Sequence, residues 1–168
     1  MEPTTQLILA VFTVMGSGVV STIVTYKLGS KRDSRDLRRM KLEECFKSID
    51  RFTTNLTINY IPFISVLNGK FSWDEANDML LERDNDGEEE HLPRLEMLSS
   101  IYFPELKSFY IELLKVRDDL GSVKSEAMQC YLEQRNPKKV ISNYKAVFDE
   151  LDRVEENFKA ALFKLAPR

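Results

Sequence analysis

Apolar residues recur every three or four positions along the carboxyl-terminal part of the chain, the spacing of one helix face. One stripe opens behind Pro104 and runs to Cys130, and a second runs from Val140 to Leu165. Asn136-Pro137 between them indicates a helix end followed by a new start, so two long helices should pack antiparallel. The apolar positions are Leu106, Phe109, Leu113, Val116, Leu120, Val123, Ala127 and Cys130, then Val140, Tyr144, Val147, Leu151, Val154, Phe158, Ala161 and Leu165.

A third apolar stripe predicts a helix from about Ser34 to Thr57. Gly29-Ser30 indicates a bend or short hinge before that helix. Pro62 indicates a break or a fresh start after it, because proline lacks the N–H that an interior helix position donates. The stripe consists of Leu42, Cys45, Ile49, Phe52 and Leu56.

Shorter elements fill the middle of the chain. Asn68-Gly69 is typical of a helix stop, and Ser72 with Glu75 forms a capping-box pattern that predicts a helix from Trp73 to about Glu82. We interpret residues 84–90, DNDGEEE, as a solvated loop, and residues 92–102 as a further short helix with Pro93 in its first turn. No segment has a strand pattern, so the predicted class is an all-α antiparallel bundle with a long carboxyl-terminal helical hairpin.

The amino-terminal segment is different in kind. From Pro3 to Tyr26 there are 24 residues without a charge, whereas a helix needs about 20 mostly apolar residues to cross a bilayer. A basic collar follows, and residues 42–168 carry 17 basic and 24 acidic side chains. The sequence thus predicts a membrane span within 1–28, a juxtamembrane linker at 29–41 and a helical bundle at 42–168. The collar is Lys27, Lys31, Arg32, Arg35, Arg38, Arg39 and Lys41.

The position of the collar predicts the topology. Only Glu2 precedes the apolar run, so an uncleaved signal anchor fits better than a signal peptide, which needs positive charge before the run. The positive-inside rule keeps the collar and the bundle cytoplasmic and the amino terminus outside. Each Lys or Arg near an anionic leaflet contributes about 1 kcal/mol, so lipid is the expected partner of the collar.

Hydroxyl and glycine residues gather on one side of the predicted span when it is drawn as a helix. Small and hydroxylated residues allow close helix contacts in lipid, so this side could mediate self-association into a homo-oligomer. Each hydroxyl can also bond a carbonyl of its own preceding turn, which leaves an inert tether or a water-lined pore open as alternatives. The residues of this hydroxyl face are Thr13, Ser17, Gly18, Ser21 and Thr25.

The chain offers little material for catalysis or metal binding. It has one histidine, His91, and two distant cysteines, Cys45 and Cys130, which are expected to be reduced and buried. An EF-hand register that places Gly87 sixth puts Pro93 where the bidentate glutamate belongs. There is also no glycine-rich phosphate loop and no nucleophile elbow. We therefore expect no enzyme, no metal and no cofactor.

The stretch Ile101-Tyr102-Phe103-Pro104-Glu105-Leu106 resembles a junction found in an uncharacterised bacterial group of small single-span proteins with a helical cytosolic domain. The resemblance implies a bacterial inner-membrane setting and supplies no activity to carry over to this chain. A structural helix corner is one interpretation of this stretch, and a partner-binding patch at Tyr102, Phe103, Pro104 and Glu105 is the other.

Three functional hypotheses follow from the sequence. In the first, the bundle binds a partner or ligand and couples that event to a self-associating span. In the second, which rests on a likeness of layout to small antiphage effectors, a cyclic nucleotide gates a span that perturbs the membrane. In the third, the span only anchors a passive scaffold.

Overall fold

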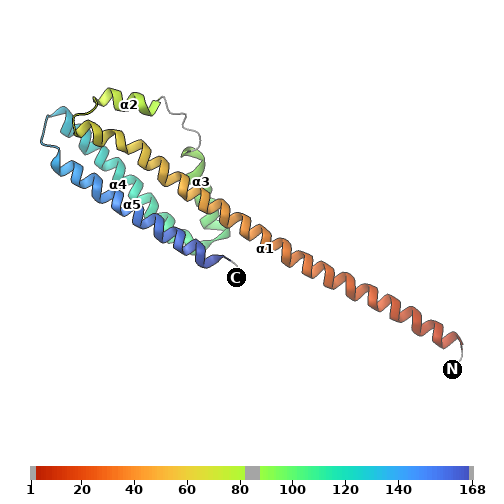
Figure 1. Cartoon of the computed structure of the whole chain (residues 1–168). Coiled ribbons are helices and arrows are strands. Elements are labelled where there is room, and N and C mark those ends of the chain that lie inside the picture. The colour runs from red at the N-terminus through yellow and green to blue at the C-terminus, as the bar shows by residue number, and fades with distance from the viewer. Residues whose placement is uncertain (1–2, 82–87, 167–168) are drawn as a thin grey trace. The chain divides into compact units, whose positions relative to one another are not determined.

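The computed structural model describes the backbone of residues 3–81 and 88–166, and the side chains of residues 33–81 and 91–166. This described part of the chain is helical and contains no strand, which confirms the all-α class (Figure 1). The chain forms two compact units, residues 1–40 and residues 41–166, and the second unit is a helical bundle. In order, the elements are α1 (Pro3–Leu67), α2 (Trp73–Leu81), α3 (Glu88–Met97), the π-helix η1 (Leu98–Tyr102), the 3-10 helix η2 (Pro104–Leu106), α4 (Lys107–Leu132) and α5 (Lys138–Leu165).

Helices α4 and α5 form the predicted antiparallel hairpin (Figure 1). Asn143 donates a hydrogen bond to Glu126 at 3.0 Å, and Arg153 lies 3.7 Å from Glu112. Later residues of α5 thus contact earlier residues of α4, as expected for an antiparallel pair. Asn136 supports the turn, since its side-chain oxygen accepts a 3.1 Å hydrogen bond from the backbone N–H of Lys138.

The part of α1 that belongs to the bundle packs against both helices of the hairpin. Lys159 of α5 reaches Asp50 at 2.7 Å, and Lys124 of α4 lies 4.1 Å from the ring centroid of Phe63. The connection through α2, α3, η1 and η2 returns the chain to the start of α4 (Figure 1).

The predicted stripes supply most of the core of the bundle. Of the hairpin positions, only Phe109, Val147, Ala161 and Leu165 are half-buried, and all four pack against the buried cluster. Fully burying a large apolar side chain stabilises a fold by about 1.5–3 kcal/mol, so these stripes are the main source of cohesion. The largest fully buried side chains include Phe52, Leu56, Phe63, Leu113, Leu120, Tyr144 and Phe158.

The helix break predicted at Pro62 is wrong, and the helix also continues through Gly29-Ser30, where a bend or short hinge was predicted. The backbone of α1 is helical through Gly29-Ser30 and through Pro62. One glycine costs a helix only about 1 kcal/mol relative to alanine. Proline costs about 3 kcal/mol, but Leu56 and Phe63 on either side of Pro62 are fully buried, and their packing offsets that cost.

The predicted end of this helix is confirmed. Gly69 has a φ of +71°, and its N–H donates to the carbonyl of Val66 at 2.9 Å, while the N–H of Lys70 donates to Ser65 at 3.0 Å. This is the Schellman arrangement, in which a left-handed residue closes the last turn.

The capping box that follows is confirmed as well. The Glu75 carboxylate accepts a 2.7 Å hydrogen bond from the Ser72 backbone N–H, and the Ser72 hydroxyl accepts one from the Glu75 N–H at 3.2 Å. The two reciprocal bonds satisfy donors that the start of α2 would otherwise leave without a partner.

The next predicted helix has different bounds from those expected. Helix α3 begins at Glu88 rather than Leu92, so Pro93 lies inside it, and part of the predicted acidic loop is helical. Glutamate is a good helix former even where apolar periodicity is absent. Residues 84–87 of the loop lie outside the described residues. The last turn is a π-helix, in which the N–H of Phe103 donates to the carbonyl of Leu98 at 2.9 Å.

Candidate functional site

The hydroxyl face of the predicted span lies outside the residues whose side chains are described. Thr13, Ser17, Gly18, Ser21 and Thr25 all belong to the backbone-only part of α1. Among the described residues, no helix has a stretch that is both long and apolar enough to cross a membrane.

The basic collar is described only in its second half. Lys27, Lys31 and Arg32 also belong to the backbone-only part, whereas Arg35, Arg38 and Arg39 are exposed on α1. Lys41, the last member of the collar, differs from these three because its side chain is only 23% exposed. Lys41 is also the first residue of the bundle unit.

Only part of the predicted partner patch is exposed. Tyr102 is 41% exposed, and Pro104 and Glu105 are exposed. Phe103 is 1% exposed and belongs to the core, so its ring is not available to a partner. The reason is the corner between η1 and η2, where the chain turns Phe103 inward beside the buried Leu106.

The structure brings the last collar residue and the patch together. The Lys41 ammonium lies 5.4 Å from the centroid of the Tyr102 ring, within the range of a cation–π interaction. The same ammonium donates to the Glu44 carboxylate at 2.7 Å, and the Arg94 guanidinium donates to that carboxylate at 2.6 Å. We call these four residues, Lys41, Glu44, Arg94 and Tyr102, the Lys41 junction. It ties the first turn of the bundle to α3 and η1.

Charge pairing makes Glu44 the centre of the junction. The hydrogen bond from Lys41 has the largest effect and lowers the pKa of the carboxyl, burial opposes it, and the contact with Arg94 adds to the lowering. Cys45, the next residue, is fully buried, and burial raises the pKa of its thiol to about 12. The thiol is therefore protonated and unreactive at neutral pH.

Glu44 and Arg94 are members of the junction that the sequence did not identify as site residues. For Glu44 a signal was present, because it lies three residues after Lys41 in a helix, a spacing that pairs opposite charges. Arg94 carried no comparable signal, since its position opposite Glu44 depends on how the connection from α2 to η2 folds back.

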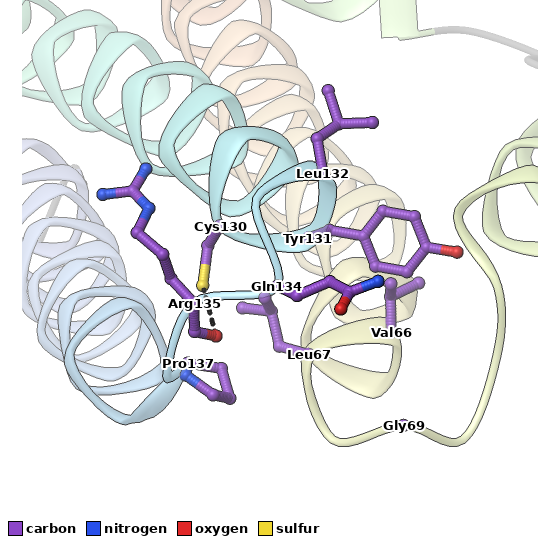
Figure 2. Close-up of a pocket in the computed structure, with 9 residues that line it drawn as sticks. All are labelled: Val66, Leu67, Gly69, Cys130, Tyr131, Leu132, Gln134, Arg135 and Pro137. Carbon is purple, nitrogen blue, oxygen red and sulfur yellow. Dashed lines mark hydrogen bonds between the residues drawn. The ribbon is translucent and has the colours of Figure 1, made fainter.

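A separate pocket of about 470 Å³ lies where the end of α1 meets the turn between α4 and α5 (Figure 2). Its walls include Val66, Leu67 and Tyr131, and the Cys130 thiol donates to the Arg135 carbonyl at 3.3 Å. The Arg135 guanidinium points away from Val66 and Leu67 (Figure 2) and pairs with Glu133 at 2.7 Å. The pocket therefore has a mixed lining of apolar and polar residues, and its arginine does not converge on a position for a phosphate.

The described residues contain no group of three potential metal ligands. His91 is buried in α3, and both cysteines are buried free thiols, as the sequence predicts for the two cysteines.

No protein-family model, no curated protein and no solved structure matches this chain. The Lys41 junction is therefore the best-defined candidate site among the described residues.

Proposed function

We propose that this chain is a non-enzymatic, single-pass protein of a bacterial inner membrane. In this proposal the amino-terminal segment crosses the membrane and self-associates. The cytoplasmic bundle binds a partner and couples that binding to the state of the span. The observation that carries the proposal is the Lys41 junction, because it joins the collar to the partner patch.

The junction suits a coupling role for a physical reason. Tyr102 belongs to η1, which lies next to the exposed Pro104 and Glu105, and it contacts the ammonium of Lys41. A partner that moves Tyr102, or that competes for Arg94, changes the charge balance around Glu44 and hence the first turn of the bundle. A passive scaffold, by contrast, does not require a contact between the patch and the collar.

The membrane part of the proposal is supported by the sequence. The 24-residue uncharged run and the seven basic residues that follow it satisfy the length and charge requirements of a signal anchor. The hydroxyl face then supplies the self-association surface, with an interhelical hydrogen bond contributing on average about 0.6 kcal/mol.

The test is a comparison of two double variants of the full chain expressed in bacteria. Ser17→Leu with Ser21→Leu removes two hydroxyls from the proposed contact face. Val19→Leu with Ile23→Leu introduces the same residue at two positions on the opposite side of the helical wheel. We expect the first variant alone to lose cross-linked oligomers in membranes and any growth arrest on overexpression.

A second arm separates coupling from anchoring. If an unrelated apolar span in place of residues 3–26 restores every measured activity, the chain is a scaffold and the coupling proposal is wrong. Thermal shift of the full chain in detergent with cyclic oligonucleotides tests the nucleotide-gated alternative, which a saturable shift would favour over a protein partner.

A further inference from the structure

Helix α2 is held to the rest of the bundle by few side chains. Ala76 is the one fully buried residue of this helix, all of which the structure describes, and Trp73 and Leu80 are half-buried against the core. Leu81 is 82% exposed. Helices α4 and α5, by contrast, each bury an apolar residue in almost every turn. Since buried apolar area supplies most of the cohesion of a fold, α2 is the most weakly attached of these three helices.

The ring of Trp73 is the main link between α2 and the bundle. Its centroid lies 4.8 Å from that of Phe63 on α1 and 6.0 Å from that of Tyr131 on α4. We call these two ring contacts the Trp73 contact. Among the residues whose side chains are described, no side-chain hydrogen bond or ion pair joins α2 to another helix. The attachment therefore depends on apolar packing around one aromatic side chain.

The start of α2 can separate from the bundle without losing hydrogen bonds. The reciprocal bonds of the capping box join Ser72 and Glu75, which both belong to this segment, so they move with it. Lys70 and Phe71, both exposed, connect Ser72 to the helix cap at Gly69, beside which an added Cβ would meet no atom within 4 Å. Exposed residues at the end of an element are where a hinge absorbs backbone rotation.

From these observations we infer that α2 is a strap, hinged at residues 69–71, that opens while α4, α5 and the bundle part of α1 stay packed. A nine-residue helix is marginal on its own, so release of the Trp73 contact is the step that frees it. Elements with few buried contacts open locally at a lower free energy than global unfolding requires. All of these residues belong to the bundle unit, so the inference is independent of the proposed span.

Opening uncovers an apolar surface that the closed form hides. Phe63 is 0% exposed, and its ring keeps the Lys124 ammonium at 4.1 Å, because Lys124 belongs to α4. Tyr131 also lines the pocket of about 470 Å³ at the end of α1 (Figure 2), so the uncovered rings adjoin that pocket. The strap therefore determines whether the apolar part of the pocket lining extends to Phe63.

The experiment is hydrogen–deuterium exchange of the full chain in mild detergent, read by mass spectrometry of peptides from α2 and α4. In the wild type we expect α2 amides to exchange at least about 100-fold faster than those of α4, because local opening costs less than global unfolding. Trp73→Ala should speed exchange in α2 by a further factor of about ten. Leu81→Ala is the matched control on the same helix and should leave exchange unchanged, since Leu81 is 82% exposed.

A substitution in the hairpin separates a strap from a single cooperative unit. Val154 is 0% exposed on α5, so Val154→Ala should speed α4 exchange by a factor of about ten or more through global unfolding. Exchange in α2 should not change, because the strap opens with the hairpin packed. Equal acceleration of both helices would overturn the inference, and so would a Trp73→Ala variant whose α2 amides exchange at the wild-type rate.

A measurement without any substitution decides the same question. Trp73 is the single tryptophan of the chain, so its emission reports the Trp73 contact alone. In urea we expect the red shift of this emission to precede the loss of circular dichroism. Coincident transitions would mean that α2 leaves only when the bundle unfolds, and the inference would then be wrong.

Discussion

Replacing Glu44 by glutamine should weaken the bundle specifically through the Lys41 junction. The change keeps the size of the side chain and removes the charge that accepts hydrogen bonds from Lys41 at 2.7 Å and Arg94 at 2.6 Å. The side chain of Lys41 is 23% exposed, that of Glu44 is 22% exposed and that of Arg94 is 44% exposed, so solvent screens both pairs in part. Fully exposed pairs contribute about 0–1 kcal/mol each, and hydrogen bonds to charged groups contribute about 1.5–3 kcal/mol. After screening, we expect a loss of about 1–1.5 kcal/mol.

The assay is thermal and urea unfolding of the full chain in mild detergent, followed by circular dichroism. In a domain of this size each kcal/mol corresponds to about 3–6 °C in Tm. Glu156→Gln is the matched control, since Glu156 is an exposed glutamate on α5, away from the junction. A double-mutant cycle of Glu44→Gln with Arg94→Gln should give a coupling energy of about 0.5–1 kcal/mol.

The pH dependence gives an independent check on the same residue. The pKa of Glu44 is lowered from 4.5 in the folded chain, mainly by the hydrogen bond from Lys41. Its stabilising contribution is therefore present above about pH 4.5 and is lost as the pH falls through the lower folded value. The difference between wild type and Glu44→Gln should shrink in that acidic range. Equal effects of Glu44→Gln and Glu156→Gln, with no coupling to Arg94, would refute the reasoning.

Two further predictions concern the bundle alone. Burial raises the pKa of the Cys45 thiol from 9.0 to about 12, so its contribution to stability is present below pH 9 and declines as pH rises through 12, by up to about 1.4 kcal/mol per pH unit. Unfolding of Cys45→Ala from pH 9 to 11 should show a shallower alkaline loss than wild type, and parallel curves would contradict this. Gly69→Ala should cost about 1–2 kcal/mol through its φ of +71°, although no atom lies within 4 Å of the added Cβ. Gly121→Ala, inside α4 with only an ordinary 3.9 Å contact to the Tyr60 hydroxyl, should instead stabilise by about 0.5–1 kcal/mol, and the same sign for both in urea unfolding would contradict the argument.

The hairpin of α4 and α5 could be predicted from sequence because its information is local. Each stripe repeats over about seven turns, and positions such as Leu113, Leu120, Leu151 and Phe158 are buried as the pattern predicts. The helix end at Gly69 could be predicted for the same reason, since the left-handed residue that ends a helix is usually a glycine.

The helix breaks and the site could not be predicted in this way. Pro62 acts as a breaker in isolation, and only the burial of its neighbours shows why α1 continues through it. Lys41 and Tyr102 could each be identified as candidate residues, but their contact depends on the return path through α2, α3 and η1. Arg94 could be identified only from the structure, in which that path places it against Glu44.

The π-helix at Leu98–Tyr102 has a consequence for how this sequence can change. Its hydrogen bond from Phe103 to Leu98 encloses one more residue than an α-helical turn does. A π-turn is wider than an α-turn and accommodates that extra residue locally, so deleting a single residue here should restore an ordinary α-helical turn with little change in the rotational phase of the residues before it. Arg94 should then keep its place against Glu44. The π-helix is therefore the point at which this part of the chain tolerates the loss of one residue.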